Sequence, residues 1–305
     1  MMITNFTELV SRAQTGNFKR VVLAGCDNEA AVQALKRAEY AGVAIPVLVG
    51  NAEAIEHARE LLASDSGAVH VVSGDSDADI AAAAVQQIRD GHGDVLMKGS
   101  IPTGALMHAV LDKESGIRGD DLLSDSFLFE HDGRLVNITD GGVILYPDVY
   151  QKQSILENAV KLYHALGVDE PKVAICAAIE KANHKMPPSL HAADLREKYE
   201  SGEITGCIVD GPLALDGALS AESLQIKKRD SALGGKADIL VMPDIEAANI
   251  TAKSVQYIAG KQAAHAIMGA EVPVLIPSRS DSAEGKYLSI TLAAVVAHPP
   301  ENEPD

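Results

Sequence analysis

The stretch "KRVVLAGCDNEAAVQALKRAEYAGVAIPVLVG", residues 19–50, decides the fold class. Residues 19–25 form an apolar run typical of a buried strand, and residues 45–50 form a second one. Between them, residues 28–42 carry apolar side chains at three- and four-residue spacing and end at a glycine, which predicts a helix. A strand, a helix and a second strand of these lengths predict a parallel βαβ unit.

The same alternation continues along the chain with one interruption. Residues 125–148 hold strand-like runs separated by "HDG" and "DGG", which are hairpin signals. Further on, the periodicity predicts one helix over residues 246–269, a last strand over 272–278 and a last helix over 282–298. The sequence therefore predicts an α/β protein with two lobes of mainly parallel sheet flanked by helices, joined near residue 140.

The composition fits this architecture and limits the partners. Hydrophobic residues make up 47% of the 305 residues, aromatic residues only 4%, and tryptophan is absent. Such a core of alanine and aliphatic side chains suits buried parallel strands covered by helices. The formal net charge of −17 disfavours nucleic acid and anionic membranes as partners, while small anions remain possible ligands.

Cysteine usage and the N-terminal residues indicate the compartment. The three cysteines are odd in number and widely spaced, which argues against a disulfide framework, and each lies in or beside an apolar segment, where a buried, inert thiol is expected: Cys26, Cys176 and Cys207. The N-terminal residues lack the apolar run of a signal peptide, and no apolar run approaches the roughly 18 residues of a membrane span. We therefore expect a cytoplasmic protein.

Several common catalytic signatures are missing from the sequence. No glycine-rich segment ends in Gly-Lys-Ser or Gly-Lys-Thr, and "GHGDVL" lacks the third glycine of a dinucleotide site. No histidines or cysteines stand at zinc-ligand spacing, and no Gly-x-Ser-x-Gly is present.

Ligands of open parallel sheets bind beyond the carboxyl ends of the strands. Four predicted strand ends carry polar side chains: "LMKGSIPTG" (96–104), "IVDGPLALD" (208–216), "VMPDIEAANITAK" (241–253) and "IPSRSDSAEG" (276–285).

Three of these strand ends also have an ordinary structural interpretation. Lys98 and Thr103 could bind an anion at a helix start, or belong to a common strand-to-helix turn. Asn249 and Lys253 lie four apart on one helix face and could hold a phosphate or carbonyl oxygen, or simply face solvent. The third strand end has two carboxylates around a Gly-Pro turn, which could be a base and its orienting group or plain turn residues: Asp210 and Asp216.

The fourth strand end is the richest in chemistry. Arg279 could hold a planar oxyanion, and Ser278 could donate to a developing one. Asp281 or Glu284 could take a proton, and Ser282 is a candidate N-cap of the last helix. A polar surface turn is the competing interpretation of the same residues.

Taken together, the segments that carry polar residues resemble one known family. They are "VLVG", "LMKGSIPTG", "ITDGGVILYPD", "KVAICAAIEKANHKMPPSLHAADL", "IVDGPLALD", "ADILVMPDIEAANITAK" and "VPVLIPSRSDSAEGKYLSITLA". In this order they resemble the phosphate acetyltransferase/phosphate butyryltransferase family, over nearly the whole chain. The motifs "EKANHKM" and "DGPLALD" resemble the butyryl branch more than the acetyl branch.

The resemblance implies the reaction acyl-CoA + phosphate = acyl phosphate + CoA, with a short-chain acyl group. It implies that Ser278 stabilises the tetrahedral oxyanion and that Arg279 binds phosphate. A carboxylate shortly downstream would deprotonate the CoA thiol. The spacing departs here from the acetyl branch, so this carboxylate is Asp281, our first choice, or Glu284. Lys253 matches a lysine of the acetyl branch, whereas the position of an arginine on the same helix falls near Tyr257 here, so that contact is lost or replaced.

The chemistry implied by the resemblance needs both substrates bound together. A CoA thiolate would attack the acyl carbonyl, and Arg279 with Lys98 or Lys253 would stabilise the developing charge. Neither a metal nor another cofactor nor a covalent enzyme intermediate is needed, because coenzyme A is itself a substrate. The substrate-binding residues expected on this basis are Lys98, Thr103, Asn249, Lys253 and Ser282.

The resemblance also implies a fold of the isocitrate/isopropylmalate dehydrogenase kind, with the active-site cleft between the lobes, and a homodimer. The last strand and helix would return to the first lobe, giving residues 1–140 plus 268–305 as one lobe and 141–267 as the other. Three other functions remain open at this stage: a phosphate acyltransferase that uses acyl carrier protein, a dehydrogenase of the related fold, and a non-catalytic binding module.

Overall fold

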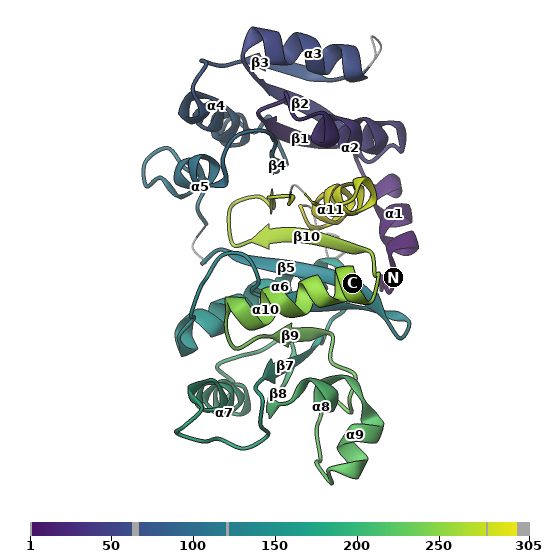
Figure 1. Cartoon of the computed structure of the whole chain (residues 1–305), viewed down its shortest axis with the longest axis vertical. Helices are drawn as coiled ribbons and strands as arrows, with labels where there is room; N and C mark the ends of the chain where they lie inside the picture. Colours follow the sequence, from purple (N-terminus) through teal and green to yellow (C-terminus); the bar gives the residue numbers. More distant parts are fainter. Residues whose placement is uncertain (1, 63–66, 120–121, 279, 298–305) are drawn as a thin grey trace, which may run out of the picture. The chain divides into compact units, whose positions relative to one another are not determined.

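The computed structural model describes residues 2–62, 67–119, 122–278 and 280–297, and the chain forms two compact units (Figure 1). The terminal unit contains Phe6–Asp121 and Ala263–Asp305, and the central unit contains Met1–Asn5 and Leu122–Gln262. Each unit is a mostly parallel sheet flanked by helices, as the sequence predicts. Among the described helices, none has the length and apolar content needed to cross a membrane.

The terminal unit is built from the βαβ units that open the chain. Its sheet has the strand order β3-β2-β1-β4-β11-β10, and all neighbouring strands run parallel except β10 and β11. The strands are β1 (Lys19–Ala24), β2 (Ala44–Gly50), β3 (Val69–Val72), β4 (Val95–Lys98), β10 (Ala263–Met268) and β11 (Val274–Leu275). The helices are α1 (Phe6–Thr15), α2 (Glu29–Tyr40), α3 (Ala52–Leu62), α4 (Asp77–Arg89), α5 (Thr103–Leu111) and α11 (Ala283–Val296).

Residues 19–50 fold as their sequence pattern predicts. Strand β1 buries the side chains of residues 21–24 completely, and β2 pairs with it in parallel from Lys19↔Ala44 onward. Helix α2 begins at the expected place because the Asn28 side chain accepts a hydrogen bond from the backbone N–H of Ala31 at 3.1 Å. Local capping and burial of the apolar faces therefore agree here.

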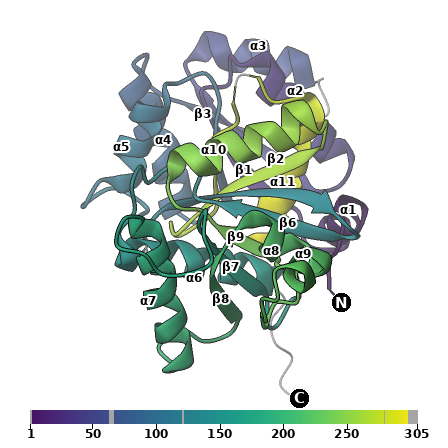
Figure 2. The same cartoon turned by 60° about the horizontal axis from the view of Figure 1, so that its bottom comes forward.

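The central unit has the strand order β5-β6-β9-β7-β8, with β5 antiparallel to β6 and the other neighbours parallel. The strands are β5 (Ser124–His131), β6 (Arg134–Thr139), β7 (Lys172–Cys176), β8 (Ile208–Leu213) and β9 (Ile239–Val241). The helices are α6 (Val149–Ala165), α7 (Pro187–Glu200), α8 (Leu215–Leu219), α9 (Ala221–Ile226), α10 (Ile245–Lys253) and a π-helical turn, η1 (Ser254–Ile258). Helix α6 packs against α7 and β9 (Figure 2).

One of the two hairpin signals is confirmed and the other is wrong. The "HDG" signal forms the β5–β6 turn, where Asp132 and Gly133 adopt positive φ angles of 46° and 74°. The "DGG" signal instead begins the loop that leads to α6. There the Asp140 carboxylate accepts hydrogen bonds from the N–H groups of residues 142–144, which fixes a loop and not a second turn.

The expected division of the chain differs from the observed one at both boundaries. Strand β6 pairs in parallel with β9, Asn137↔Ile239, so the β5–β6 hairpin belongs to the central sheet and the boundary lies at residue 121 instead of 140. The helix expected over residues 246–269 ends early, because residues 263–268 form β10 and pair with β11. The terminal unit therefore resumes at residue 263 and not at 268.

Candidate active site

The terminal unit has a topological switch point at β1 and β4. From β1 the chain builds β2 and β3 on one side of the sheet, then returns to β4 on the other side. Open α/β sheets bind ligands at such points, outside the carboxyl ends of the strands. Strand β11 lies beside β4 in parallel, Leu275↔Met97, so the loops that follow β4 and β11 leave the sheet at the same edge.

Two glycines let the chain pass closely over the ends of β1 and β4. A Cβ added at Gly99 would lie 1.8 Å from the carbonyl oxygen of Gly25, and one at Gly25, where φ is +85°, would lie 2.4 Å from the Ser100 Oγ. The N–H of Gly99 donates to the Ala24 carbonyl at 2.9 Å, and that of Ser100 to Gly25 at 3.0 Å. The loop after β4 is therefore held in one place against the end of β1.

Lys98 and Thr103 lie at the two ends of this loop. Lys98 is the last residue of β4, and its Nζ donates to the carbonyls of Gly99 at 3.2 Å and Ile101 at 3.3 Å. Thr103 is exposed and begins α5, whose N-cap, Pro102, makes no side-chain hydrogen bond to the helix. An ammonium group and helix N–H groups without a side-chain cap thus occur on one short loop, which suits an anionic ligand.

The loop after β11 is closed by its own hydrogen bonds. The Ser278 N–H donates to the Asp281 Oδ2 at 2.6 Å, and the Asp281 N–H donates to the Ser278 carbonyl at 3.1 Å. The Ser278 Oγ lies 3.0 Å from the Ser280 Oγ. The other carboxylate oxygen of Asp281, Oδ1, is buried and has no hydrogen-bond partner within the part of the chain that the structure describes. Arg279 lies outside the described residues.

Helix α11 begins at the expected N-cap, and one of its side chains binds the loop after β11. The Ser282 Oγ accepts the Gly285 N–H at 3.0 Å, so this hydroxyl already has a structural partner. Lys286, which sequence reasoning missed, is buried, and its Nζ donates to the Asp281 carbonyl at 2.5 Å. A lysine one helical turn after an N-cap in an otherwise apolar helix was the available signal.

The two candidate bases differ in their surroundings. Glu284 pairs with Arg37 of α2 through both carboxylate oxygens, and the Oε1–Nη2 distance is 3.2 Å. The Arg37 guanidinium also stacks 4.0 Å from the ring centroid of Tyr287. The hydrogen bond to Glu284 raises the pKa of Arg37. Glu284 therefore has a structural cation partner, whereas Asp281 binds the backbone of the loop that carries Ser278.

Asn249 and Lys253 belong to the central unit, on the helix that follows the carboxyl end of β9. The Asn249 Nδ2 donates to the Gly141 carbonyl at 3.0 Å, which ties α10 to the loop after β6. The Lys253 Nζ lies 5.8 Å from the ring centroid of Tyr257. The structure brings these two residues together, and it brings Lys98, Thr103, Ser278, Asp281 and Ser282 to one sheet edge of the terminal unit.

Sequence reasoning missed the buried Asp140, which supports Asn249. Its two carboxylate oxygens accept four backbone N–H groups, from residues 125, 142, 143 and 144, at 2.8–3.1 Å. Burial raises the pKa of Asp140 to about 6, and the charge of Asp125 acts in the same direction. This carboxyl group fixes the loop whose Gly141 carbonyl binds Asn249. The "TDGG" sequence was the available signal.

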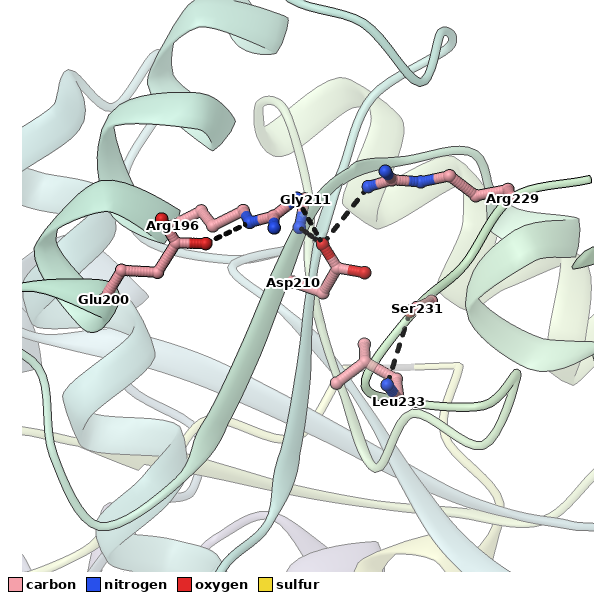
Figure 3. A network of polar contacts seen from close by, with 7 residues as sticks. All are labelled: Arg196, Glu200, Asp210, Gly211, Arg229, Ser231 and Leu233. Carbon is pink, nitrogen blue, oxygen red and sulfur yellow. Dashed lines mark hydrogen bonds and ion pairs between the residues drawn. The ribbon is translucent and has the colours of Figure 1, made fainter.

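Asp210 is held in a cation cluster, and this supports its structural interpretation (Figure 3). Its Oδ1 accepts from the Gly211 N–H at 2.8 Å and lies 3.3 Å from Arg196 Nη1 and 3.2 Å from Arg229 Nη2. Asp216 binds the Lys227 Nζ at 2.8 Å. Both carboxylates therefore form ion pairs, and Asp210 also accepts a backbone hydrogen bond from the Gly-Pro turn.

The cysteines are free and buried, as expected. Burial raises the pKa of Cys26 and of Cys207 to about 11 and that of Cys176 to about 12, so these thiols stay protonated at neutral pH and are poor nucleophiles. Across residues 2–62, 67–119, 122–278 and 280–297, no group of three His, Cys, Asp or Glu side chains is arranged to hold a metal ion.

Comparisons with known proteins identify the family of the chain. Residues 74–294 match the family described as "Phosphate acetyl/butaryl transferase". The chain is 37% identical to the phosphate butyryltransferase of Clostridium acetobutylicum, covering 97% of this chain and 99% of that protein. It is also 37% identical to the phosphate acetyltransferase of Thermotoga maritima, covering 96% and 100%.

A solved structure gives the same assignment. A branched-chain phosphotransacylase from Enterococcus faecalis matches this fold with a TM-score of 0.82 at 28% identity, covering 92% of this chain and 100% of that one. A family match over most of the chain and full-length relatives above 30% identity lead to one conclusion: the chain belongs to the phosphate acetyl/butyryl transferase family.

Proposed function

We propose that the chain transfers a short-chain acyl group reversibly between coenzyme A and inorganic phosphate. The observation that carries this function is the Ser278–Asp281 loop, closed by hydrogen bonds at the carboxyl end of β11 and next to the Lys98 loop of β4. It offers a hydroxyl donor, a carboxylate and a nearby ammonium group on rigid elements. The family match supports a phosphate acyltransferase over an enzyme that uses acyl carrier protein or a dehydrogenase.

The reaction is a direct acyl transfer in a ternary complex. Asp281 accepts the thiol proton of CoA, and the thiolate attacks the acyl carbon of the acyl phosphate. A new carbon–sulfur bond forms, Ser278 donates to the oxyanion, and the carbon–oxygen bond to phosphate then breaks. Arg279 holds the departing phosphate with both arms of its guanidinium. In the reverse direction phosphate attacks the thioester, and the proton returns to the CoA sulfur.

Lys98, Thr103, Asn249 and Lys253 are the proposed substrate-binding residues. Lys98 and the start of α5 suit a phosphate group, because the ammonium and the helix N–H groups converge on one loop. Asn249 and Lys253 would contact the other substrate from α10. Ser282 contributes through the N-terminus of α11, since its own hydroxyl is used as the cap. The proposed reaction needs no cofactor, because coenzyme A enters as a substrate.

We assign the chain to the butyryl branch on the motifs "EKANHKM" and "DGPLALD". The chain is equally identical to a butyryltransferase and to an acetyltransferase, so overall identity does not distinguish the branches and our assignment rests on these motifs. We further propose that the protein acts in the cytoplasm as a homodimer. Light scattering at a concentration used for kinetics should give twice the mass of one chain, and a single-chain mass would contradict the dimer.

The direct test is thiol release from a panel of acyl-CoA esters. The purified protein is mixed with phosphate and each ester from acetyl to hexanoyl, including branched chains, and free thiol is measured. Phosphate-dependent release that is fastest with a four-carbon acyl group supports both the reaction and the branch. A maximum with acetyl-CoA would contradict the branch alone. A folded sample that binds CoA but releases no thiol from any ester would contradict the reaction and favour a binding role.

A further inference from the structure

A pocket of about 1000 Å³ lies in the central unit and is lined by none of the residues assigned to acyl transfer. The β5–β6 turn forms one wall, α8 and the start of α9 form another, and the segment before β9 forms the third. Its volume is in the range of small-molecule binding sites in proteins. The lining residues on which the argument rests are His131, Arg134, Leu215, Leu219, Ser220 and Lys236.

The two cations of the pocket lie at the opposite ends of β6 and β9 from the proposed substrate-binding residues of this unit. Arg134 is the first residue of β6, and Lys236 precedes β9, which runs parallel to β6. Asn249 and Lys253 instead follow the carboxyl end of β9. The pocket is therefore separate, within this unit, from the residues assigned to acyl transfer.

Two cations of the pocket, Arg134 and Lys236, are not held in ion pairs in the described part of the chain, although the formal net charge is −17. Arg134 donates from Nε to the Ala237 carbonyl at 3.4 Å, and its Nη2 is buried without a hydrogen-bond partner. Arg134 also lines the pocket, where a bound anion would meet a guanidinium group that no described carboxylate holds in an ion pair.

Two carboxylates, Asp132 and Asp216, also line the pocket. Asp216 binds the Lys227 Nζ at 2.8 Å, and Asp132 lies 3.5 Å from the His131 Nε2, a contact that is ionic only when the imidazole is protonated. Asp238, on which the charge of Arg134 acts, accepts the backbone N–H of Lys172 at 2.8 Å. None of these carboxylates forms an ion pair with Arg134 or Lys236 among the residues that the structure describes, so both cations can contact a ligand.

The α8 wall of the pocket contributes two apolar side chains, and a close backbone contact fixes its far end. Leu215 is 42% exposed, and Leu219 lies beside it on α8. Gly235 has a φ of +70°, and a Cβ added there would lie 2.3 Å from the Ala221 nitrogen, so the backbone contacts the start of α9 directly. We propose that this pocket binds a small organic anion, with its phosphate or carboxylate group on Arg134 and Lys236 and its apolar portion on α8.

Three probes with the same ring test the site by calorimetry. Phenyl phosphate and benzoate differ in the anionic group, and benzyl alcohol is the neutral control. We expect the wild-type protein to bind at least one anion, and the preferred anion tells a phosphate ester from a carboxylate. We expect Arg134→Gln with Lys236→Gln to weaken that binding about tenfold or more, because two charge-assisted contacts are lost.

Matched variants make the result decisive. Lys236 is exposed on a loop, so Lys236→Gln should fold normally and weaken anion binding by itself. Lys253→Gln, in the proposed substrate site, should leave it unchanged. The proposal is overturned if neither anion binds the wild-type protein, if benzyl alcohol binds equally well, or if Lys236→Gln binds the anion with wild-type affinity. Its failure would leave the thiol-release test unaffected, since that test does not involve this pocket.

Discussion

Single residues at the carboxyl edge of the terminal sheet fix the loop that carries Lys98 and Thr103, two of the proposed substrate-binding residues. The steric restriction is greatest at Gly99, because its α-carbon faces the Gly25 carbonyl with no room for a side chain. The loop that carries Lys98 and leads to Thr103 can follow its observed path only while both positions remain glycine. Positioning of reacting groups contributes several kcal/mol to catalysis, so a shift of this loop should affect turnover.

Gly99→Ala should therefore cost both stability and rate. Its Cβ would lie 1.8 Å from the Gly25 carbonyl oxygen, so the loop must move. We expect a loss of roughly 1–3 kcal/mol in the free energy of unfolding and a fall in kcat of about tenfold or more. Gly104→Ala is the matched control, since nothing lies within 4 Å of its added Cβ. Equal urea midpoints and rates for the two variants would contradict the tight loop.

At the scale of single residues, the role of a side chain could be predicted when its hydrogen-bond partner was close along the chain. Ser282 as N-cap and Asn28 at the start of α2 follow from residues three positions away. The ion pair of Glu284 could not be predicted, because its partner Arg37 lies 247 residues away, so Glu284 stayed an alternative to Asp281 as the base. Lys286 was missed for a similar reason, because its burial depends on how α11 packs in the terminal unit.

At the scale of elements, α6, α7 and α10 meet around a buried lysine. Lys152 is 2% exposed, and its Nζ lies 3.3 Å from the His191 Nδ1 of α7. Burial lowers the pKa of Lys152 to about 8, and Asp244, the N-cap of α10, acts in the opposite direction. Burial also lowers the pKa of His191, which faces Asp148 and Asp194 as well.

This lysine gives stability a defined pH dependence. The pKa of about 8 lies below the ordinary value of 10.5, so between these pH values the unfolded chain holds a proton that the folded chain has released. The contribution of Lys152 to the free energy of unfolding therefore rises from pH 8 to pH 10. Below pH 8 the folded protein must bury the charged form.

Lys152→Met should consequently stabilise the protein at pH 7, by on the order of 1–3 kcal/mol, because a buried charge is replaced by an apolar chain of similar length. The advantage should shrink as the pH approaches 10. Urea unfolding of both proteins at pH 7 and pH 9.5 measures this difference, with exposed Lys185→Met as a control that should show no such trend. A constant difference between wild type and Lys152→Met would contradict the lowered pKa.

Most helices and strands were predicted correctly from the sequence. The predictions failed where strand pairing between distant parts of the chain determines the structure. Residues 246–269 have helical periodicity, yet residues 263–268 form β10 because β11 offers them a partner. Gly260, at a φ of +65°, lies in the break between the helical turn and this strand. The β5–β6 hairpin was predicted from its turn residues, but its place in the central sheet depends on β9, about a hundred residues further on.

At the scale of the whole molecule, the buried thiols bear on the kinetic mechanism. None of the three cysteines can readily form a thiolate at neutral pH, which favours direct transfer between bound substrates over an acyl-cysteine intermediate. Initial rates with butyryl-CoA and phosphate varied together should give intersecting double-reciprocal lines. Parallel lines, or an acylated protein detected by mass spectrometry after incubation with butyryl-CoA alone, would contradict the ternary complex.

The central claim is that the loop after β11 carries the transfer while neighbouring charges support the fold. Asp281→Asn and Glu284→Gln separate the two roles, because each removes one negative charge from the same loop and helix start. We predict that Asp281→Asn lowers kcat for phosphate-dependent thiol release by about 10²-fold or more, as expected for a lost general base. Glu284→Gln should stay within about threefold of wild type, since an exposed ion pair contributes little.

The one measurement to make first is therefore this pair of kcat values with butyryl-CoA, on samples whose thermal unfolding is checked beside them. A large loss in Asp281→Asn alone supports the assigned base. Full activity in Asp281→Asn, or a larger loss in Glu284→Gln, would contradict it.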